Sequence, residues 1–101
     1  MVRKPKKWVV YVLHYADDNL FKVWCSLSKD WAKKRLNYWN CKLQSKWIIY
    51  AIMPVSDKYR EERLLIWDLF KTHKCLYTES VELFFDVKEE IDYYFDNHIF
   101  L

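Results

Sequence analysis

Lysine and tryptophan side chains alternate between residues 31 and 47, and together they could bind nucleic acid. The stretch contains four lysines and three tryptophans: Lys33, Lys34, Lys42 and Lys46, and Trp31, Trp39 and Trp47. Ammonium groups attract backbone phosphates, and indole rings are platforms on which unpaired bases stack. The stretch therefore indicates a nucleic-acid-binding surface, although an ordinary solvated helix face would use the same residue types.

Charge is distributed unevenly along the chain. Residues 1–50 hold 11 Lys/Arg and 3 Asp/Glu, whereas residues 51–101 hold 6 and 11, within a formal net charge of +3. Four of the basic residues lie in positions 1–7 around Pro5, which predicts a short basic arm ahead of a single domain, 8–101. This asymmetry favours a basic face that meets phosphate, with solvated charge as the alternative.

The chain has no glycine, and this excludes several classes of site. A Walker phosphate loop and a dinucleotide fingerprint both need glycine where the backbone approaches phosphate closely, so ATPase, GTPase and classical NAD-binding functions are excluded. Turns must instead use Asn and Asp. The cysteines, Cys25, Cys41 and Cys75, form no CxxC pair, which favours free thiols over a structural zinc site.

No segment of the sequence indicates a membrane span or a leader. No apolar run approaches the roughly 20 residues that cross a bilayer, and the basic start does not resemble a signal peptide. We therefore expect a soluble intracellular protein with no membrane partner.

The hydrophobic pattern predicts an α+β domain in the order β-β-α-β-α-(β)-α. Trp8–Leu13 and Leu20–Cys25 are β-branched and aromatic runs around a turn at 16–19, which predicts a hairpin. Trp47–Met53 is a nearly continuous apolar run ended by Pro54, and it predicts a central strand covered on both faces. Short extended segments are expected at 75–77 and 82–85.

Three helices are predicted from capping residues and apolar spacing. Their limits are Ser28 or Asp30 to about Asn40, Ser56 or Asp57 to about His73, and a last helix opened by a capping box with Asp86 at the cap. Their expected buried stripes are Ala32, Leu36, Trp39 and Leu43; Tyr59, Ile66, Phe70 and His73; and Val87, Ile91, Tyr94, Phe95 and His98. At about 100° per residue, Glu62 lies on the Tyr59 side, Glu61 on the opposite face, and Arg35 at a stripe border.

Four short motifs occur along this order of elements. They are Val9-Val10-Tyr11, Lys22-Val23-Trp24, Arg35-Leu36 and a glutamate at Glu62 or, less well, Glu61. In that order they resemble the GIY tripeptide, the K-I-G form of the second motif, the R-L pair and the metal-binding glutamate of the GIY-YIG nuclease superfamily. The form most similar is the small stand-alone one of phages and large DNA viruses. Residues 82–87 are similar to the family's E-W-F-D-V stretch, so the resemblance spans roughly residues 8–96.

The resemblance implies a small three-layer-like fold and a metal-dependent hydrolase of nucleic-acid phosphodiesters. Tyr11 would help to activate water, Lys22 would belong to the same catalytic set, and Arg35 would hold the scissile phosphate. Glu62 would bind Mg²⁺ or Mn²⁺. Such roles suit the residue types, because a guanidinium can donate two hydrogen bonds to phosphate and a carboxylate is a preferred magnesium ligand.

The sequence departs from the family pattern at three places. Val9 and Trp24 replace the two motif glycines, and Trp24 would either block a substrate or stack on a base. In the second helix, the family's E-x-x-x-H-x-x-F spacing anchored on Phe70 puts Trp67 and Arg63 at the histidine and glutamate positions. The helical face nevertheless favours Glu62 as the metal ligand.

Three functions remain open from the sequence. The chain is an active metal-dependent endonuclease, a nuclease-fold protein that binds DNA or another nucleic acid without cleaving it, or a viral or phage module that binds a host protein. A viral protein of this kind would act in the cytoplasm or nucleus of the host cell, as a monomer or homodimer.

Overall fold

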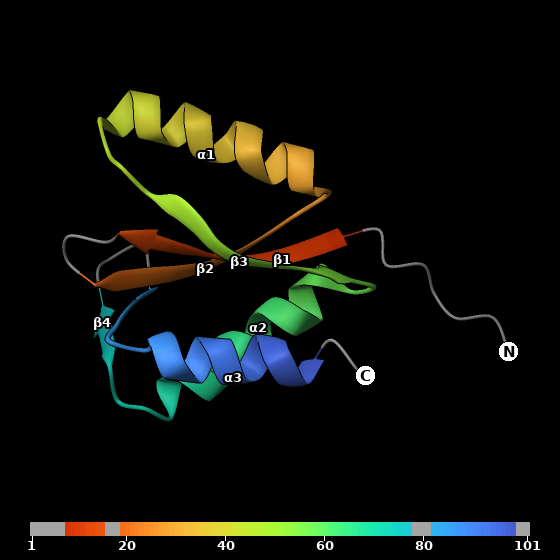
Figure 1. The fold of residues 1–101 in the computed structure, drawn as a ribbon, viewed down its shortest axis with the longest axis vertical. Helices are drawn as coiled ribbons and strands as arrows, with labels where there is room; N and C mark the ends of the chain where they lie inside the picture. The colour runs from red at the N-terminus through yellow and green to blue at the C-terminus, as the bar shows by residue number, and fades with distance from the viewer. Residues whose placement is uncertain (1–7, 16–18, 78–81, 99–101) are drawn as a thin grey trace, which may run out of the picture.

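A five-stranded antiparallel sheet forms the middle layer of a three-layer α+β fold (Figure 1). The computed structural model describes residues 8–15, 19–77 and 82–98, and the basic arm predicted at 1–7 lies outside them. The strands are β1 (Trp8–Tyr15), β2 (Leu20–Ser26), β3 (Ile48–Val55), β4 (Cys75–Tyr77) and β5 (Glu82–Phe85). Helix α1 (Lys29–Leu43) covers one face, and α2 (Lys58–Phe70) and α3 (Lys88–His98) cover the other. The predicted class and element order are confirmed.

Strand β1 is the central strand of the sheet, whose order is β3-β1-β2-β5-β4. It pairs with β2 on one side and β3 on the other, and its residues from Val9 to Leu13 are buried. The prediction that Trp47–Met53 is a central strand is wrong, because β3 lies at the sheet edge and continues through Pro54. An edge strand accepts proline because one side of its backbone needs no partner strand.

Alternation along β1 divides the interior into two cores. Val10 and Val12 point toward α2 and α3 and join a large cluster that includes Phe21, Leu65 and Ile91. Residues Val9, Tyr11 and Leu13 point the other way and pack with Ala32 and Leu36 of α1 in a smaller cluster. This period-two pattern places Tyr11 on the α1 side of the sheet.

Helix α1 begins where Ser28 caps it. The Ser28 hydroxyl accepts from the Trp31 amide at 3.3 Å, so Ser28 rather than Asp30 is the cap. The helix continues past Asn40 to Leu43, and Gln44 ends it in the left-handed conformation. Leu43 was expected in the buried stripe but is 62% exposed, because the last turn extends beyond the sheet residues that cover Ala32 and Leu36.

Helix α2 is capped by Asp57 and ends at Phe70, three residues before the predicted end. Its buried residues are Leu65 and Leu69, of which Leu69 was expected on the flank of the stripe. The predicted Ile66 and Phe70 pack against the core, whereas Tyr59 is 63% exposed, so the stripe was wrong at that end. Glu61 precedes Leu65 by one turn on the same face and is half-buried, not turned to the opposite face. Its carboxylate accepts from the Tyr94 hydroxyl of α3 at 3.2 Å.

The residue that caps helix α3 is Val87, one residue later than the predicted cap, Asp86. The amide of Ile91 donates to the Val87 carbonyl at 3.0 Å, while Asp86 has a left-handed backbone with φ 57° and does not cap the helix. The stripe of Val87, Ile91, Tyr94 and Phe95 is buried as predicted, and the His98 side chain lies outside the described part. No helix within residues 8–15, 19–77 and 82–98 is long and apolar enough to cross a membrane.

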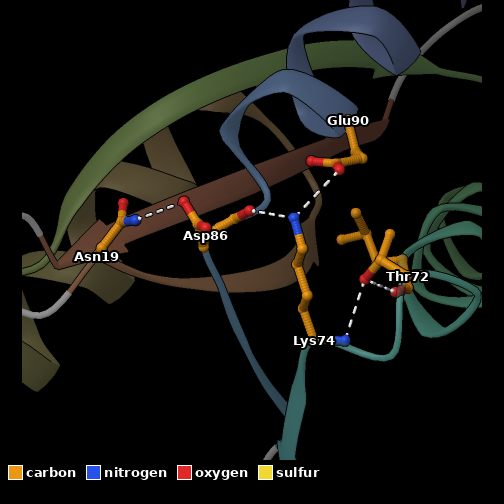
Figure 2. A network of polar contacts seen from close by, with 6 residues as sticks. Asn19, Thr72, Lys74, Asp86 and Glu90 are labelled. Atoms are coloured by element: carbon orange, nitrogen blue, oxygen red, sulfur yellow. Dashed lines mark hydrogen bonds and ion pairs between the residues drawn. The ribbon is translucent and has the colours of Figure 1, made fainter.

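Left-handed turn positions are filled without glycine. Asn19 and Asp86 have positive φ, as predicted for Asn and Asp, and so do Gln44 and His73. Figure 2 shows the Asn19 amide donating to the Asp86 carboxylate at 3.2 Å, and Lys74 donating to the Asp86 carbonyl at 3.1 Å. Lys74 also pairs with Glu90 at 3.6 Å, so this network ties β2, β4 and α3 together.

Candidate nucleic-acid interface

Trp24 covers Tyr11 on the α1 side of the sheet. The two residues are direct cross-strand partners on β1 and β2, and their rings meet edge to face with centroids 6.1 Å apart. Tyr11 is 0% exposed, whereas Trp24 is half-buried. At the position where the resemblance has a glycine, this chain therefore has an indole that seals the tyrosine from solvent.

Arg35 of α1 lies over Trp24. The guanidinium carbon is 4.3 Å from the Trp24 ring centroid, and Nη1 donates to the Cys25 carbonyl at 3.5 Å. A guanidinium stacked on an indole keeps its edge donors available for further acceptors. Arg35 is exposed, which agrees with its predicted place at the border of the helix stripe.

The Tyr11 hydroxyl is buried and makes no hydrogen bond of standard geometry within the described residues, although the Arg35 guanidinium lies close to it. Burial raises the pKa of Tyr11 to about 12; the nearby Arg35 guanidinium opposes this rise, and Cys25 and Glu62 add to it. Tyr11 is therefore a neutral phenol at pH 7. In this arrangement the phenol touches neither solvent nor a bound strand.

Glu62 approaches the same region from the other face of the sheet. Strand β2 pairs with β5 only at Leu20 and Phe21, so among the described residues no strand flanks the outer edge of its later part. There, burial together with the hydrogen bond and charge of Glu62 raises the pKa of the Cys25 thiol to about 12. Arg35 and Glu62 thus both lie close enough to Tyr11 and Cys25 to shift the pKa values of these two groups.

Lys22 lies between two indoles. Its ammonium nitrogen is 4.7 Å from the Trp47 ring centroid and 5.6 Å from that of Trp24. Burial lowers the pKa of Lys22, and no carboxylate pairs with it among residues 8–15, 19–77 and 82–98. The structure therefore places Lys22 in the lining of a pocket, where it shares the Trp24 ring with Arg35.

A pocket of about 390 Å³ lies between α1 and the sheet. Three indoles, those of Trp24, Trp39 and Trp47, line it together with Lys22 and Arg35. No acidic side chain is among its lining residues. The pocket thus combines aromatic walls with positive charge.

Asn40 fixes the backbone position of Trp47, which forms one wall of the pocket. Its side-chain nitrogen donates to the Trp47 carbonyl at 2.8 Å, and its oxygen accepts from the Trp47 amide at 3.1 Å. The same oxygen accepts from the Ser45 hydroxyl at 2.9 Å. Sequence inspection did not single out Asn40, since an asparagine near a helix end is common and its partners follow four to seven residues later.

The outer surface of α1 has exposed cations beside exposed rings. Lys34 lies 5.2 Å from the Trp31 ring centroid, and Lys42 lies 5.3 Å from that of Trp39 and 5.7 Å from that of Tyr38. Trp31 and Tyr38 are 55% and 57% exposed. The remaining predicted phosphate-binding lysines, Lys33 on α1 and Lys46 just after it, are also exposed.

Tyr38 was missed by the sequence analysis, although its spacing could have revealed it. It follows Trp31 by seven residues and precedes Lys42 by four, so all three lie along one side of a helix. An open hollow on this surface is lined by Trp31, Lys34, Arg35 and Tyr38, among others. Of the predicted residues, Trp31, Lys34 and Lys42 therefore lie together with Tyr38 on one surface of α1, whereas Trp39 also lines the pocket.

The described residues offer only a limited set of metal ligands. Within residues 8–15, 19–77 and 82–98, no group of three or more His, Cys, Asp or Glu side chains could hold a metal ion. Glu62 is a single half-buried carboxylate beside Cys25, whereas Glu61 is bonded to Tyr94. One carboxylate fits a magnesium ion that takes its other ligands from water and substrate phosphate.

Comparisons with known proteins give no family for this chain. No protein-family model matches it, no curated protein is similar to it, and no solved structure matches its fold.

Proposed function

We propose that this chain binds single-stranded nucleic acid through the outer surface of α1 and the adjoining pocket. The observation that carries the proposal is the pairing of cations with rings on one side of the sheet: Lys22, Lys34, Arg35 and Lys42 each lie over an indole or phenol. A strand with unpaired bases presents both chemistries that such a surface recognises, phosphates for the cations and flat bases for the rings.

The charge of α1 supports the same assignment. Between residues 29 and 43 the helix has five Lys/Arg and one acidic residue, Asp30, which lies in its first turn. The exposed rings of Trp31 and Tyr38 lie among these cations. Exposed aromatic rings stack on bases only when the bases are not paired in a duplex, so the single-stranded form is the expected ligand.

We further propose that the chain has the scaffold of a GIY-YIG-like nuclease and uses it to bind nucleic acid instead of cleaving it. Trp24 seals Tyr11, while the cations lie outside this seal and remain available to phosphate. Cys25, Cys41 and Cys75 are free thiols, which supports action in a reducing compartment, the cytoplasm or nucleus of a host cell if the protein is viral.

A salt titration tests the binding. Fluorescence anisotropy of a labelled oligothymidylate would be measured for the native chain and for Lys34→Gln/Lys42→Gln across a range of salt concentrations. Removing two phosphate contacts should reduce the slope of log K against log salt by about 1.4, since each contact to a single strand contributes about 0.7.

The matched control is Lys71→Gln/Lys88→Gln, which removes the same charge from exposed lysines outside the α1 surface. Its salt slope should equal that of the native chain. Equal losses in the two variants would show that net charge, and not the α1 surface, attracts the strand. Complete absence of binding would leave a protein partner, such as a host protein, as the function of this surface.

A second candidate, metal-dependent cleavage, is favoured by the grouping of Tyr11, Arg35 and Glu62 around Cys25. Arg35 would neutralise phosphoryl oxygens, and Glu62 would hold Mg²⁺ or Mn²⁺, which supplies Lewis-acid chemistry when bound. Tyr11 could contact a substrate only after Trp24 moved, because its ring has no exposed surface.

Plasmid nicking with Mg²⁺ or Mn²⁺ tests cleavage. If the candidate is right, Glu62→Gln should lower the nicking rate by about a hundredfold or more, the scale of losing one charge-stabilising group. Glu61→Gln should nick like the native chain, and Trp24→Gly should nick faster. Equal nicking by Glu62→Gln and the native chain would exclude the candidate.

A further inference from the structure

We infer that the pocket between α1 and the sheet binds one nucleobase together with its phosphate, and this inference rests on the proposed binding of nucleic acid. A base of this kind could belong to a free mononucleotide or to one residue of a strand. The pocket adjoins the outer surface of α1, and Arg35 lines both the pocket and the hollow on that surface.

The walls of the pocket suit a flat aromatic ligand. Trp24, Trp39 and Trp47 bring three indoles to one cavity, and each is half-buried with part of its surface left open. The hydrogen bonds from Asn40 hold the Trp47 backbone in place before any ligand arrives. A base that entered between these rings would stack on prepared surfaces, so little ordering would be needed on binding.

The charges of the pocket require an acceptor-rich or anionic group. Lys22 is a half-buried cation beside two indoles, and no acidic side chain lines the cavity to balance it. Arg35 adds a second cation with an exposed edge. A phosphate attached to the stacked base would supply the missing negative charge.

The hydrogen-bonding groups of the pocket further restrict the class of ligand that it can bind. The amide of Asn40 is fully engaged by the Trp47 backbone and by Ser45, so it offers little to a ligand. The charged donors of the pocket are Lys22 and Arg35, and these cations, like the indole N–H groups of its walls, donate but do not accept hydrogen bonds. A volume of about 390 Å³ lies within the range of roughly 300–1,000 Å³ typical of small-molecule sites.

An abasic oligonucleotide measures how much the bases contribute to binding. Anisotropy would compare oligothymidylate with the same backbone lacking its bases, since both keep every phosphate. Base stacking at a protein site changes affinity by roughly 5- to 100-fold per base, so the abasic strand should bind at least about fivefold more weakly.

Two variants show whether the weaker binding of the abasic strand arises at the pocket or at the outer surface of α1. Lys22→Gln removes the pocket cation, and in it the difference between the two strands should shrink. Lys34→Gln/Lys42→Gln alters the outer surface, and in it both strands should weaken together while their ratio is retained. Thermal melting of each variant would verify that it folds.

The outcomes distinguish this inference from the proposed function. If both strands bind the native chain equally, neither the pocket nor the exposed rings of α1 take a base, and only phosphate binding by the cations of α1 stands. If neither strand binds, the proposed function fails. Quenching of tryptophan fluorescence by adenosine monophosphate then tests whether the pocket binds a free nucleotide. Quenching that is lost in Lys22→Gln would identify a free nucleotide as the ligand, and no quenching would overturn the inference.

Discussion

The two faces of the sheet differ in how they are closed and in the charge they present. On one face, α2 and α3 together bury Phe21, Leu65, Phe84 and Ile91 completely. On the other, α1 alone covers a smaller core and leaves a pocket of indoles and cations. Packing is therefore concentrated on the first face, and the second keeps the groups that can meet a ligand.

The hollow between α2 and α3 provides a counterpart to the α1 pocket. It is lined by acidic Asp68, Glu89 and Glu90, with Lys71 as its cation. Phosphate would be repelled there and attracted at α1. The comparison shows that the uneven charge along the chain becomes a charge difference between two faces once the helices are placed.

The largest expected difference between the faces is in stability. Leu65→Ala removes a fully buried side chain from the closed core and should lower the free energy of unfolding by about 2–5 kcal/mol. Leu36→Ala, next to the open pocket, should cost less, because fewer partner atoms surround it. Urea denaturation of both variants measures this, and an equal or greater loss for Leu36→Ala would contradict the contrast.

Alkaline pH should weaken the α1 face through Tyr11. Its folded pKa of about 12 exceeds its ordinary value of 10, so the unfolded chain loses this proton first as the pH rises. Stability contributed by the neutral phenol is complete below pH 10 and is lost between pH 10 and 12, by on the order of 2–3 kcal/mol. Tyr11→Phe should flatten the decline in urea midpoints over this interval, and an unchanged decline would show that other groups cause it.

Polar networks on the two faces should differ in how much they contribute to the free energy of unfolding. Asn40→Ala breaks partly buried hydrogen bonds to the Trp47 backbone and should cost about 1–3 kcal/mol. Lys74→Met breaks the network of Figure 2, whose ion pair with Glu90 is solvent-exposed, and should cost less than about 1 kcal/mol. Thermal melting compares them, and a larger loss for Lys74→Met would reverse this ranking.

The smallest effect concerns thiol reactivity and leaves the fold intact. Cys41 is exposed on α1, whereas Cys25 is half-buried with its thiol pKa raised to about 12. Since the thiolate is the reactive form, iodoacetamide at pH 8 should label Cys41 well before Cys25. Mass spectrometry of the digested protein measures the order. In Glu62→Gln, which removes a carboxylate that raises this pKa, Cys25 should react faster.

Local sequence patterns predicted the positions of the helices and strands well, but they predicted less well which of these elements pack against each other. The runs of β-branched and aromatic residues gave β1 and β2, and the stripe of α3 was correct from Val87 to Phe95. The stripe of α2 was misplaced, because Leu65 and Leu69 face both β-sheet and α3, and periodicity cannot say which neighbours are present. Glu61 was misplaced for the same reason.

The candidate site was partly foreseeable. Trp31, Lys34 and Lys42 of α1 were identified from the sequence, and the structure places them on one surface beside Tyr38. Lys22 was grouped with Tyr11 by resemblance, yet it lies beside Trp47, a residue far along the chain. The catalytic roles given to Tyr11, Lys22, Arg35 and Glu62 remain a prediction.

By itself, the sequence determined the α+β order, the turns built without glycine and the excess of positive charge before residue 51. These features depend on propensity and composition, which act over a few residues. Only the tertiary structure decided that β1 is central, that Trp24 covers Tyr11, and that Lys22 lies between two indoles. Such outcomes depend on which distant segments pair and pack, a choice made by the whole chain at once.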